Sequence, residues 1–122
     1  MKIEKFEDLI SWQKALELTV EIYNTYEKSK DFGFKDQIQR ASVSIMNNIA
    51  EGFERKSNKE LLQFFYIAKG SAAEVKSMII LSLELKKINH EQYDKLILLV
   101  TDIIKLRSGF IKSISVQNRA WG

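Results

Sequence analysis

The sequence contains no cysteine and no proline, and it has only five glycines in 122 residues. Without cysteine the chain has no thiolate for catalysis, no disulfide and no zinc site built on sulfur. Proline and glycine normally punctuate β-rich folds, so their scarcity favours long uninterrupted helices. The sequence therefore predicts an all-α protein and excludes thiol chemistry.

A long apolar segment is also lacking. No apolar run approaches the roughly 20 residues that a helix needs to span a bilayer, and Met1 to Lys5 contain no apolar signal core. We therefore expect a cytoplasmic protein. The lone histidine, His90, stands beside acidic Glu91, and one histidine makes a poor metal site. We expect no cofactor and no small-molecule substrate.

The residues that are present suit one ordinary soluble domain. Hydrophobic residues make up 45% of the chain and charged residues 29%, which is enough to bury a core without a metal or a disulfide. The net charge of +3 is a mild basic bias. One copy with this charge binds polyanions weakly, whereas a ring of copies multiplies both charge and contact number. The oligomeric state should therefore matter to function.

Four segments repeat apolar residues at spacings of three and four, which is the period of an amphipathic helix. Short connections between long helices make neighbours antiparallel. We therefore predict an up-down-up-down antiparallel four-helix bundle over residues 1–115, followed by a tail at 116–122 that is mobile or docked on a partner. The four predicted segments are Asp8 to Lys28, Phe34 to Arg55, Ser57 to Lys87 and Asn89 to Ile114.

Capping signals and one apolar face define each predicted helix. Ser57 with Glu60, and Asn89 with Gln92, have the spacing of a capping box and mark the starts of the third and fourth helices. The first helix should face the core with Leu9, Trp12, Leu16, Thr19, Tyr23 and Tyr26, flanked by Ala15, Leu18 and Ile22. The second should use Ile38, Ala41, Ile45, Ile49 and Phe53, and the fourth Tyr93, Leu96, Leu99, Val100, Ile103, Phe110, Ile111 and Ile114.

Three short motifs place polar and small residues inside these apolar patterns, where helix propensity alone would favour leucine and alanine. They are Trp12-Gln13-Lys14-Ala15, Asn48-Ile49-Ala50-Glu51-Gly52 with Arg55, and Ala68-Lys69-Gly70-Ser71 with Glu74. With these motifs the chain resembles the four-helix-bundle proteins encoded within intervening sequences of bacterial 23S rRNA genes, relatives of the accessory variability proteins of diversity-generating retroelements. The resemblance covers the chain from about Phe6 to Ile114. It implies the bundle fold, rings of five copies and binding of RNA or DNA.

A polar cluster should lie across the second, third and fourth helices. Because the turn near Ser57 is tight, Ser44 should face Ser71, and Arg40 or Ala41 should face Glu74. Arg107 falls in an apolar stripe and needs an anion, for which Glu74 is the nearest candidate by register. The predicted cluster comprises Arg40, Ser44, Asn48, Glu51, Ser71, Glu74 and Arg107.

Two roles are open for this cluster. Buried polar networks commonly fix helix register, and small residues nearby would let the helix backbones approach closely. Alternatively, Glu51 or Glu74 could act as a general acid or base, which requires a raised pKa and a nearby reacting group. No nucleophile, metal-ligand pair or phosphate-binding glycine loop accompanies them, so we predict a protein without enzymatic activity. The small residues are Gly52, Ala68, Ser71, Ala72 and Ser82.

Basic residues gather at both ends of the predicted bundle. Either group could bind phosphates by charge alone, without reading bases, or could simply be a solvated end that keeps the protein soluble. The family-like motif that ends at Arg55 favours that end. Phe32, Phe34 and Trp121 could stack on unpaired bases, although Phe32 and Phe34 are better placed to plug the bundle end. The two groups are Lys28, Lys30, Lys35, Lys86 and Lys87 at one end, and Arg55, Lys56 and Lys59 at the other.

Several apolar residues of the second and third helices should point away from the core. Such residues on adjacent helices resemble a subunit interface, and together with the family resemblance they predict a homopentamer with closed cyclic symmetry. They are Val43, Ala50, Leu62, Tyr66 and Ile80.

Three functions therefore compete. The first is a non-enzymatic, ring-forming homo-oligomer that binds nucleic acid or scaffolds RNA. The second is a structural module that docks a protein partner, such as a reverse transcriptase. The third, an enzyme acting on nucleic acid, is disfavoured by the missing catalytic groups. Binding that weakens with salt supports the first function, whereas salt-insensitive association with a protein supports the second.

Overall fold

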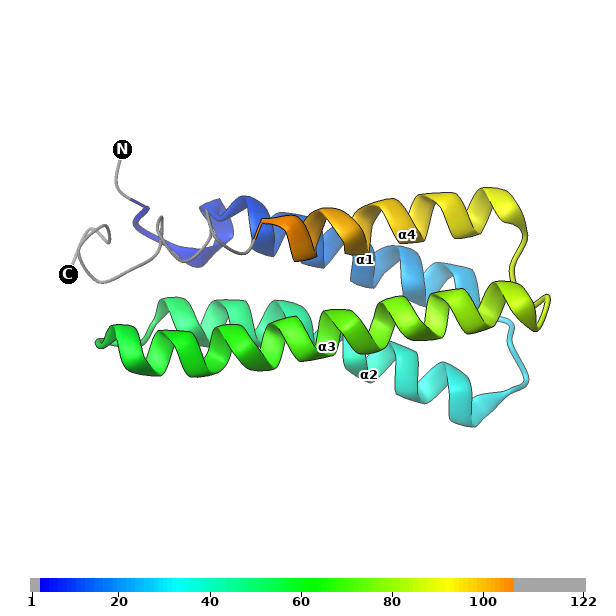
Figure 1. The fold of residues 1–122 in the computed structure, drawn as a ribbon, viewed down its shortest axis with the longest axis horizontal. Coiled ribbons are helices and arrows are strands. Elements are labelled where there is room, and N and C mark those ends of the chain that lie inside the picture. Colours follow the sequence, from blue (N-terminus) through cyan, green and yellow to red (C-terminus); the bar gives the residue numbers. More distant parts are fainter. Residues whose placement is uncertain (1–2, 107–122) are drawn as a thin grey trace.

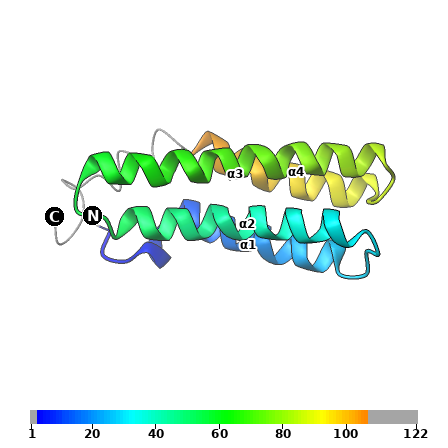
Figure 2. The same cartoon turned by 90° about the horizontal axis from the view of Figure 1, so that it is seen from below.

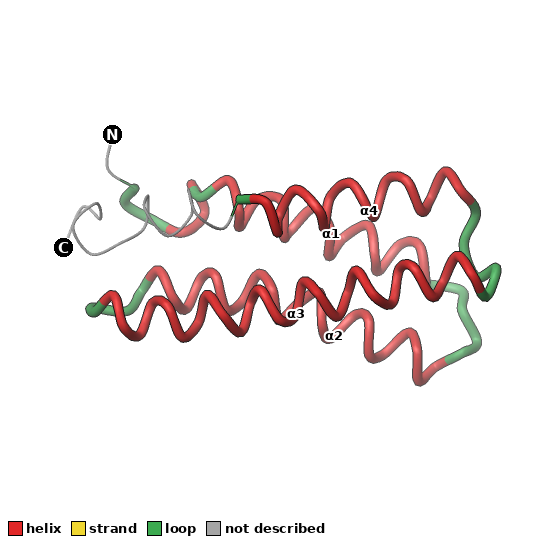
Figure 3. Tube along the Cα trace, in the orientation of Figure 1, coloured by secondary structure: helices red, strands yellow, loops and turns green. Residues whose placement is uncertain are grey.

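Four helices make up most of residues 3–106, the part of the chain that the computed structural model describes (Figure 1). Short connections join them, so that successive helices run in opposite directions (Figure 3). The protein is thus an all-α, up-down-up-down four-helix bundle, as predicted. The helices are α1 Ile10–Tyr26, α2 Phe32–Phe53, α3 Asn58–Glu84 and α4 His90–Lys105, with a 3-10 turn, η1, at Phe6–Asp8. The predicted tail, 116–122, and the predicted helical residues Phe110, Ile111 and Ile114 lie outside the described residues.

The helices form a square arrangement in which α1 and α3 occupy diagonal corners (Figures 1 and 2). Helix α2 packs against α1 and α3, and α4 packs against the same two helices. The α1–α2 and α3–α4 connections lie at one end of the bundle, on the right in Figure 1, and the α2–α3 turn lies at the other. We call these the loop end (residues 27–31 and 85–89) and the turn end (residues 54–57).

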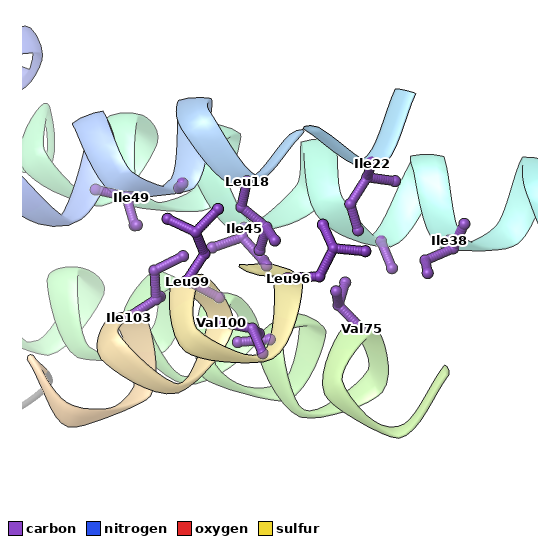
Figure 4. Close-up of a cluster of buried hydrophobic side chains, with 14 of the residues drawn as sticks. Leu18, Ile22, Ile38, Ile45, Ile49, Val75, Leu96, Leu99, Val100 and Ile103 are labelled. Carbon is purple, nitrogen blue, oxygen red and sulfur yellow. The ribbon is translucent and has the colours of Figure 1, made fainter. Parts of the chain in front are cut away.

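The core lies along the axis between the four helices (Figure 4). Its side chains are mostly aliphatic, with Tyr26, Phe53 and Phe65 among them, and almost fully buried. Each large apolar side chain contributes about 2 kcal/mol to folding through the apolar surface it removes from water. The predicted inner faces of the second helix and of the described part of the fourth are confirmed. Core residues labelled in Figure 4 include Leu18 and Ile22 of α1, Ile38, Ile45 and Ile49 of α2, Val75 of α3, and Leu96, Leu99, Val100 and Ile103 of α4.

The predicted inner face of the first helix is partly wrong. Leu16 and Tyr23 are 38% and 44% exposed, whereas Leu18 and Ile22 are fully buried. The apolar stripe of α1 is wider than the surface that α2 and α4 can cover. Packing therefore decides which part of the stripe is buried, and the rest faces solvent.

Side-chain caps determine where the helices begin. Asn89 Oδ1 accepts from the Gln92 amide at 2.8 Å and Gln92 Oε1 accepts from the Asn89 amide at 3.0 Å, which confirms the predicted capping box. Ser57 Oγ accepts from the Glu60 amide at 3.2 Å, so α3 begins as predicted. Asp31 Oδ1 accepts from the Phe34 amide at 3.2 Å. Because Asp31 is this cap, α2 begins at Phe32, two residues before the predicted start.

Small and hydroxylated residues let the helices pack closely, as the sequence predicts. A methyl group at Gly52 of α2 would lie 3.1 Å from the Phe64 Cβ of α3. On the diagonal, the Tyr26 hydroxyl of α1 lies 2.8 Å from the buried Ser82 Oγ of α3. Burial raises the pKa of Tyr26, and the hydrogen bond with Ser82 partly opposes this rise.

Candidate nucleic-acid interface

The loop end gathers the five lysines that the sequence assigns to it. Lys28, Lys30 and Lys86 are exposed, and no ion pair within residues 3–106 engages them. Lys87 Nζ lies 2.9 Å from Asp31 Oδ2, and Lys35 Nζ donates to the Glu27 carbonyl oxygen at 2.7 Å. Three ammonium groups at this end are therefore free to contact phosphates, and two have structural partners.

Asp31 ties the two connections of the loop end together. Its carboxylate accepts hydrogen bonds from the Lys87 ammonium and from the Phe34 amide. The hydrogen bond from Lys87, followed by that from Phe34, lowers the pKa of Asp31 below its ordinary value. The α1–α2 and α3–α4 connections are therefore held together by one carboxylate.

The two phenylalanines of this end differ in environment. The Phe34 ring centre lies 5.6 Å from that of Tyr26, and Lys87 Nζ lies 5.3 Å above the Phe34 ring, so Phe34 plugs the bundle end as predicted. Phe32 is 70% exposed, which contradicts its predicted plugging role. The Asp31 cap starts α2 at Phe32 and turns that side chain outward, where its ring is accessible for stacking. Trp121 lies outside the described residues.

Lys86 has a left-handed backbone conformation, with φ at 59°. It follows the last turn of α3, where its amide donates to the Leu83 carbonyl oxygen and the next amide, that of Lys87, donates to the Ser82 carbonyl oxygen at 2.9 Å. Glycine normally fills this position because a Cβ atom is strained there. A lysine here costs stability, but it places a cation beside the partial negative charge of the helix terminus.

At the turn end, Arg55 is held in place by its neighbours. Its guanidinium carbon lies 4.4 Å from the centre of the Phe64 ring, and Nη2 lies 3.4 Å from Glu51 Oε2. Lys56 and Lys59 are exposed, but so are the carboxylates of Glu54 and Glu60. An open cleft of about 460 Å³ lies beside Arg55, lined among the described residues by Phe6, Ala50, Glu51, Glu54 and Arg55. Acidic groups thus offset the predicted phosphate contacts at this end.

The basic bias of the chain arises outside the described bundle. All 16 acidic residues fall within residues 3–106, whereas four of the 19 basic residues fall outside this range. Because the chain carries +3 overall, residues 3–106 carry a net charge of −1. The basic residues outside this range are Lys2, Arg107, Lys112 and Arg119.

Three members of the predicted polar cluster meet between α2 and α3. The hydroxyl oxygens of Ser44 and Ser71 lie 2.8 Å apart, which confirms the predicted register. Asn48 Nδ2 donates to the Ser44 carbonyl at 2.8 Å and to Ser44 Oγ at 3.1 Å. All three residues are half-buried. This small network can fix the pairing of the two helices, which is the structural role considered for the cluster.

Arg40, Glu51 and Glu74 do not join this network, which corrects the prediction. Arg40 is exposed and pairs with Asp36 at 2.9 Å, and Glu51 pairs with Arg55. Glu74 is exposed and accepts from Gln37 Nε2 at 3.1 Å. Pairs one helical turn apart form in water, so they avoid the desolvation cost of a buried cross-helix pair. Arg107 lies outside the described residues.

The exposure of these carboxylates also bears on catalysis. Glu51 and Glu74 are exposed, and each lines an open cleft, Glu74 together with Arg40, Ser44 and Ser71 of the predicted cluster. Exposed carboxylates differ from the desolvated ones that usually serve as a general acid or base. Within residues 3–106, no three His, Asp or Glu side chains are grouped closely enough to hold a metal ion. No helix in the same range is long and apolar enough to cross a membrane.

Some of these partners could have been found in the sequence. Asp36 with Arg40, and Glu51 with Arg55, have the i, i+4 spacing of helical ion pairs. The contact between Phe64 and Arg55 could not have been found in the sequence, because the turn between α2 and α3 brings the two residues together. The Asp31 to Lys87 pair joins residues 56 positions apart and likewise depends on the fold.

Comparison with known proteins agrees with this architecture. Residues 7–109 match the family of 23S rRNA-intervening sequence proteins. A crystal structure of a protein of unknown function from the S23 ribosomal protein family of Bacteroides thetaiotaomicron superposes with a TM-score of 0.79. The two sequences are 31% identical, over 84% of this chain and 99% of that one. No curated protein matches the chain. Neither matching description names an enzymatic activity.

Proposed function

Because the chain belongs to the 23S rRNA-intervening sequence protein family, we propose that it is a non-enzymatic protein that assembles with copies of itself and binds nucleic acid. Family membership carries this proposal, since the family is named for intervening sequences of 23S rRNA. RNA is accordingly the first ligand to test, with DNA as the comparison. A ring of five copies remains the proposed stoichiometry, on the basis of the resemblance described for the sequence.

The loop end is the better phosphate-binding surface of the two. Lys28, Lys30 and Lys86 are exposed there without an ion pair among residues 3–106. Arg55 at the turn end already contacts Phe64 and Glu51, which leaves two cations there, Lys56 and Lys59, without an ion pair among the same residues. A cation that must leave a partner gains less from a phosphate than a free one does. Contacts of this kind neutralise phosphates without reading sequence, so sequence preference should be slight.

Assembly of several copies would compensate for the low charge of one bundle by adding more lysines that contact the same nucleic acid. Residues 3–106 of a single copy carry −1, so one copy offers a few lysines on a nearly neutral surface. Assembly repeats the loop end once per subunit and lets several contacts act together. In this proposal the oligomer, and not the subunit, is the nucleic-acid-binding unit.

Filter binding of a structured RNA across a salt series tests the proposal. Affinity should fall steeply as salt rises, because each neutralised phosphate releases condensed counterions. Charge reversal at Lys28, Lys30 and Lys86 should lower the slope of log affinity against log salt by about three for each subunit whose loop end contacts the RNA. Lys87 is left unchanged because it pairs with Asp31.

Two further sets of reversals serve as comparisons. Arg55, Lys56 and Lys59 test the turn end with the same number of charges, and Lys112 with Arg119 tests the basic residues beyond the described bundle. Equal losses from all three sets would indicate general basicity instead of a directed surface. Absence of RNA or DNA retention at low salt, with the oligomer intact, would reject nucleic-acid binding.

A second candidate function is a module that docks another protein. It is favoured by the large apolar side chains exposed on α1 and α3, among them Val20, Tyr66 and Ile67. A reverse transcriptase is the partner suggested by the resemblance to retroelement proteins. Association with such a partner should be insensitive to salt, unlike phosphate contacts.

A further inference from the structure

The outward side of α3 carries almost no charge. Eight of its residues between Tyr66 and Leu81 are exposed, and Glu74 is the only charged one among them. The outer surface of a helix in a monomeric bundle is normally polar. An apolar outer surface therefore indicates that another molecule covers α3. We call its apolar and small members the α3 face: Tyr66, Ile67, Gly70, Ala73, Ile80 and Leu81.

Gly70, at the centre of this face, has no packing reason within the described chain. A Cβ atom placed on it would meet nothing within 4 Å, and the helix conformation does not require glycine. Glycine inside a helix is less stable than alanine, so its presence needs another cause. Together with Ala73, it leaves a shallow site in which a second helix can approach the α3 backbone closely.

A second apolar face lies on α1. Leu16, Val20 and Tyr23 are spaced by four and three residues, so they form one stripe, and 38–49% of each side chain is exposed. We call these three residues the α1 face. Val43 of α2 is half-buried and its neighbour Ser42 accepts a hydrogen bond from Thr19 of α1, so Val43 borders this stripe.

The two faces lie on opposite sides of the molecule. Helices α1 and α3 occupy diagonal corners of the bundle (Figures 1 and 2). A self-complementary dimer needs only one such face, whereas a head-to-tail contact uses two different faces of each copy. Two unlike apolar faces on opposite sides are what a head-to-tail assembly requires.

Two lysines beside the α3 face complement the carboxylates beside the α1 face, and Glu74 is the one exposed acidic residue on the α3 side between Tyr66 and Leu81. Glu17 and Glu27 are exposed next to the α1 face, and Lys69 and Lys76 are half-buried next to the α3 face. No ion pair among the described residues engages any of these four side chains. Residues 107–122 contain no Asp or Glu side chain that could pair with the two lysines. A second copy offers suitable carboxylates, because Glu17 and Glu27 beside its α1 face are also without an ion pair among the described residues.

On the basis of the self-assembly proposed above, we propose that the α1 face of one copy packs against the α3 face of the next. The contact places Leu16, Val20 and Tyr23 over the site formed by Gly70 and Ala73, with Tyr66 and Ile80 at its two ends. Repeating the contact around an axis closes a ring.

Two single-face variants and their mixture test this arrangement. Val20→Asp alters only the α1 face, and Tyr66→Asp alters only the α3 face. Each residue is exposed, so both variants should keep the helical circular dichroism of the wild type. Light scattering should give a monomer for each variant alone. Their equimolar mixture should give a dimer, because one intact α1 face meets one intact α3 face and no further contact is available.

Leu98→Asp is the matched control, because Leu98 is 62% exposed on α4, outside both faces. It should keep the wild-type mass. If an aspartate variant loses helical content, Leu16→Lys and Ile80→Lys provide a second pair.

Other outcomes separate this inference from the proposed function. A wild-type oligomer whose mass survives Val20→Asp or Tyr66→Asp would overturn the assignment of the faces while leaving self-assembly in place. A mixture of folded variants that remains monomeric would overturn the head-to-tail arrangement. A monomeric wild type would reject both proposals. All masses are measured without nucleic acid, so the result does not depend on RNA binding.

Discussion

Charged residues in this bundle pair along one helix, across the loop end, or between α1 and α4, where Lys14 meets Asp102 and Lys95 meets Glu21. Asp36 pairs with Arg40 and Glu51 with Arg55 along α2, and Lys87 pairs with Asp31 across the loop end. Each pair keeps contact with solvent, so neither partner is fully desolvated. The buried ion pair predicted for Glu74 is replaced by an exposed contact with Gln37.

Asp31 should make stability depend on pH. Its pKa is lowered in the folded protein, first by Lys87 and then by the Phe34 amide, so folding favours the ionised carboxylate. This stabilisation is present above the unfolded pKa, which is about 3.9, and is lost as pH falls through the folded pKa. Asp31→Asn keeps a good helix cap but loses the Lys87 ion pair. Its melting temperature should lie below that of the wild type at pH 7, and the gap should narrow below pH 4.

Asp94→Asn is a suitable control for that measurement, because Asp94 is exposed on α4. It should change the melting temperature little at either pH. A gap for Asp31→Asn that is the same at pH 7 and pH 3 would show that the Lys87 contact does not stabilise the fold.

Lys86 combines a strained backbone conformation with a side chain that is proposed to bind RNA, and one substitution tests both. Its φ of 59° suits glycine, so Lys86→Gly should stabilise the fold by about 1 kcal/mol. The same change removes a free cation from the loop end and should weaken RNA binding in filter assays. Chemical denaturation measures the first effect, with Lys30→Gly as the control at a position without left-handed φ. Higher stability with undiminished RNA affinity would exclude Lys86 from the interface.

At the scale of helices, apolar periodicity identified each helix but not its rotation about its own axis, which decides the side chains that face the core. Helix α2 has one clear apolar face, and its buried residues are the five predicted together with Ser42 and Gly52. Helix α1 has a broader apolar surface, and its neighbours cover only the part that includes Leu18 and Ile22. The uncovered part becomes the α1 face. Core residues are hardest to predict in a helix such as α1, because its apolar surface is larger than the area that its neighbours can bury.

The same substitution in two helices should have opposite effects. Gly52→Ala places a methyl group 3.1 Å from the Phe64 Cβ atom, which cannot move without its backbone, and should destabilise the fold by about 1–2 kcal/mol. Gly70→Ala meets nothing within 4 Å and should stabilise it by about 1 kcal/mol through helix propensity. Both are measured by urea denaturation in a Val20→Asp background, in which assembly is blocked. A stabilising Gly52→Ala would contradict the close contact at Gly52, and a destabilising Gly70→Ala would contradict the open space at Gly70.

At the scale of the whole molecule, charge and assembly act together. Residues 3–106 are nearly neutral, so a single bundle has little electrostatic attraction for RNA. Linking several loop ends raises the effective concentration of each remaining contact once the first has formed. The proposed nucleic-acid affinity thus depends on the proposed subunit contact.

Blocking assembly should therefore weaken RNA binding without any change at the loop end. Tyr66 lies on α3, far in sequence from the two connections of the loop end. Tyr66→Asp should reduce the affinity for RNA by a factor on the order of 100. Leu98→Asp adds the same charge outside both faces and should retain most of the affinity. Filter binding at low salt measures both. A folded, monomeric Tyr66→Asp variant with wild-type affinity would show that one subunit suffices.

Much of the fold followed from local patterns in the chain. Apolar spacing located the four helices, and the Asn89 and Ser57 caps marked where two of them begin, because both signals act within a few residues. The tight turn between α2 and α3 also set a register that brought Ser44 to Ser71. Residues 107–122, which include Arg107, lie outside the described residues, so their predicted roles stay predictions.

The sequence by itself determined that the protein is a helical bundle, because helix periodicity, capping and the lack of proline are local properties. Tertiary structure decided which part of the broad apolar surface of α1 is buried and which ions pair between different parts of the chain, because those outcomes depend on competition between partners from different helices. Asp31 with Lys87 and Arg55 with Phe64 meet only after the chain folds. The exposure of Leu16, Tyr23 and the α3 face has the same origin, since four packed helices bury only the surfaces that face one another.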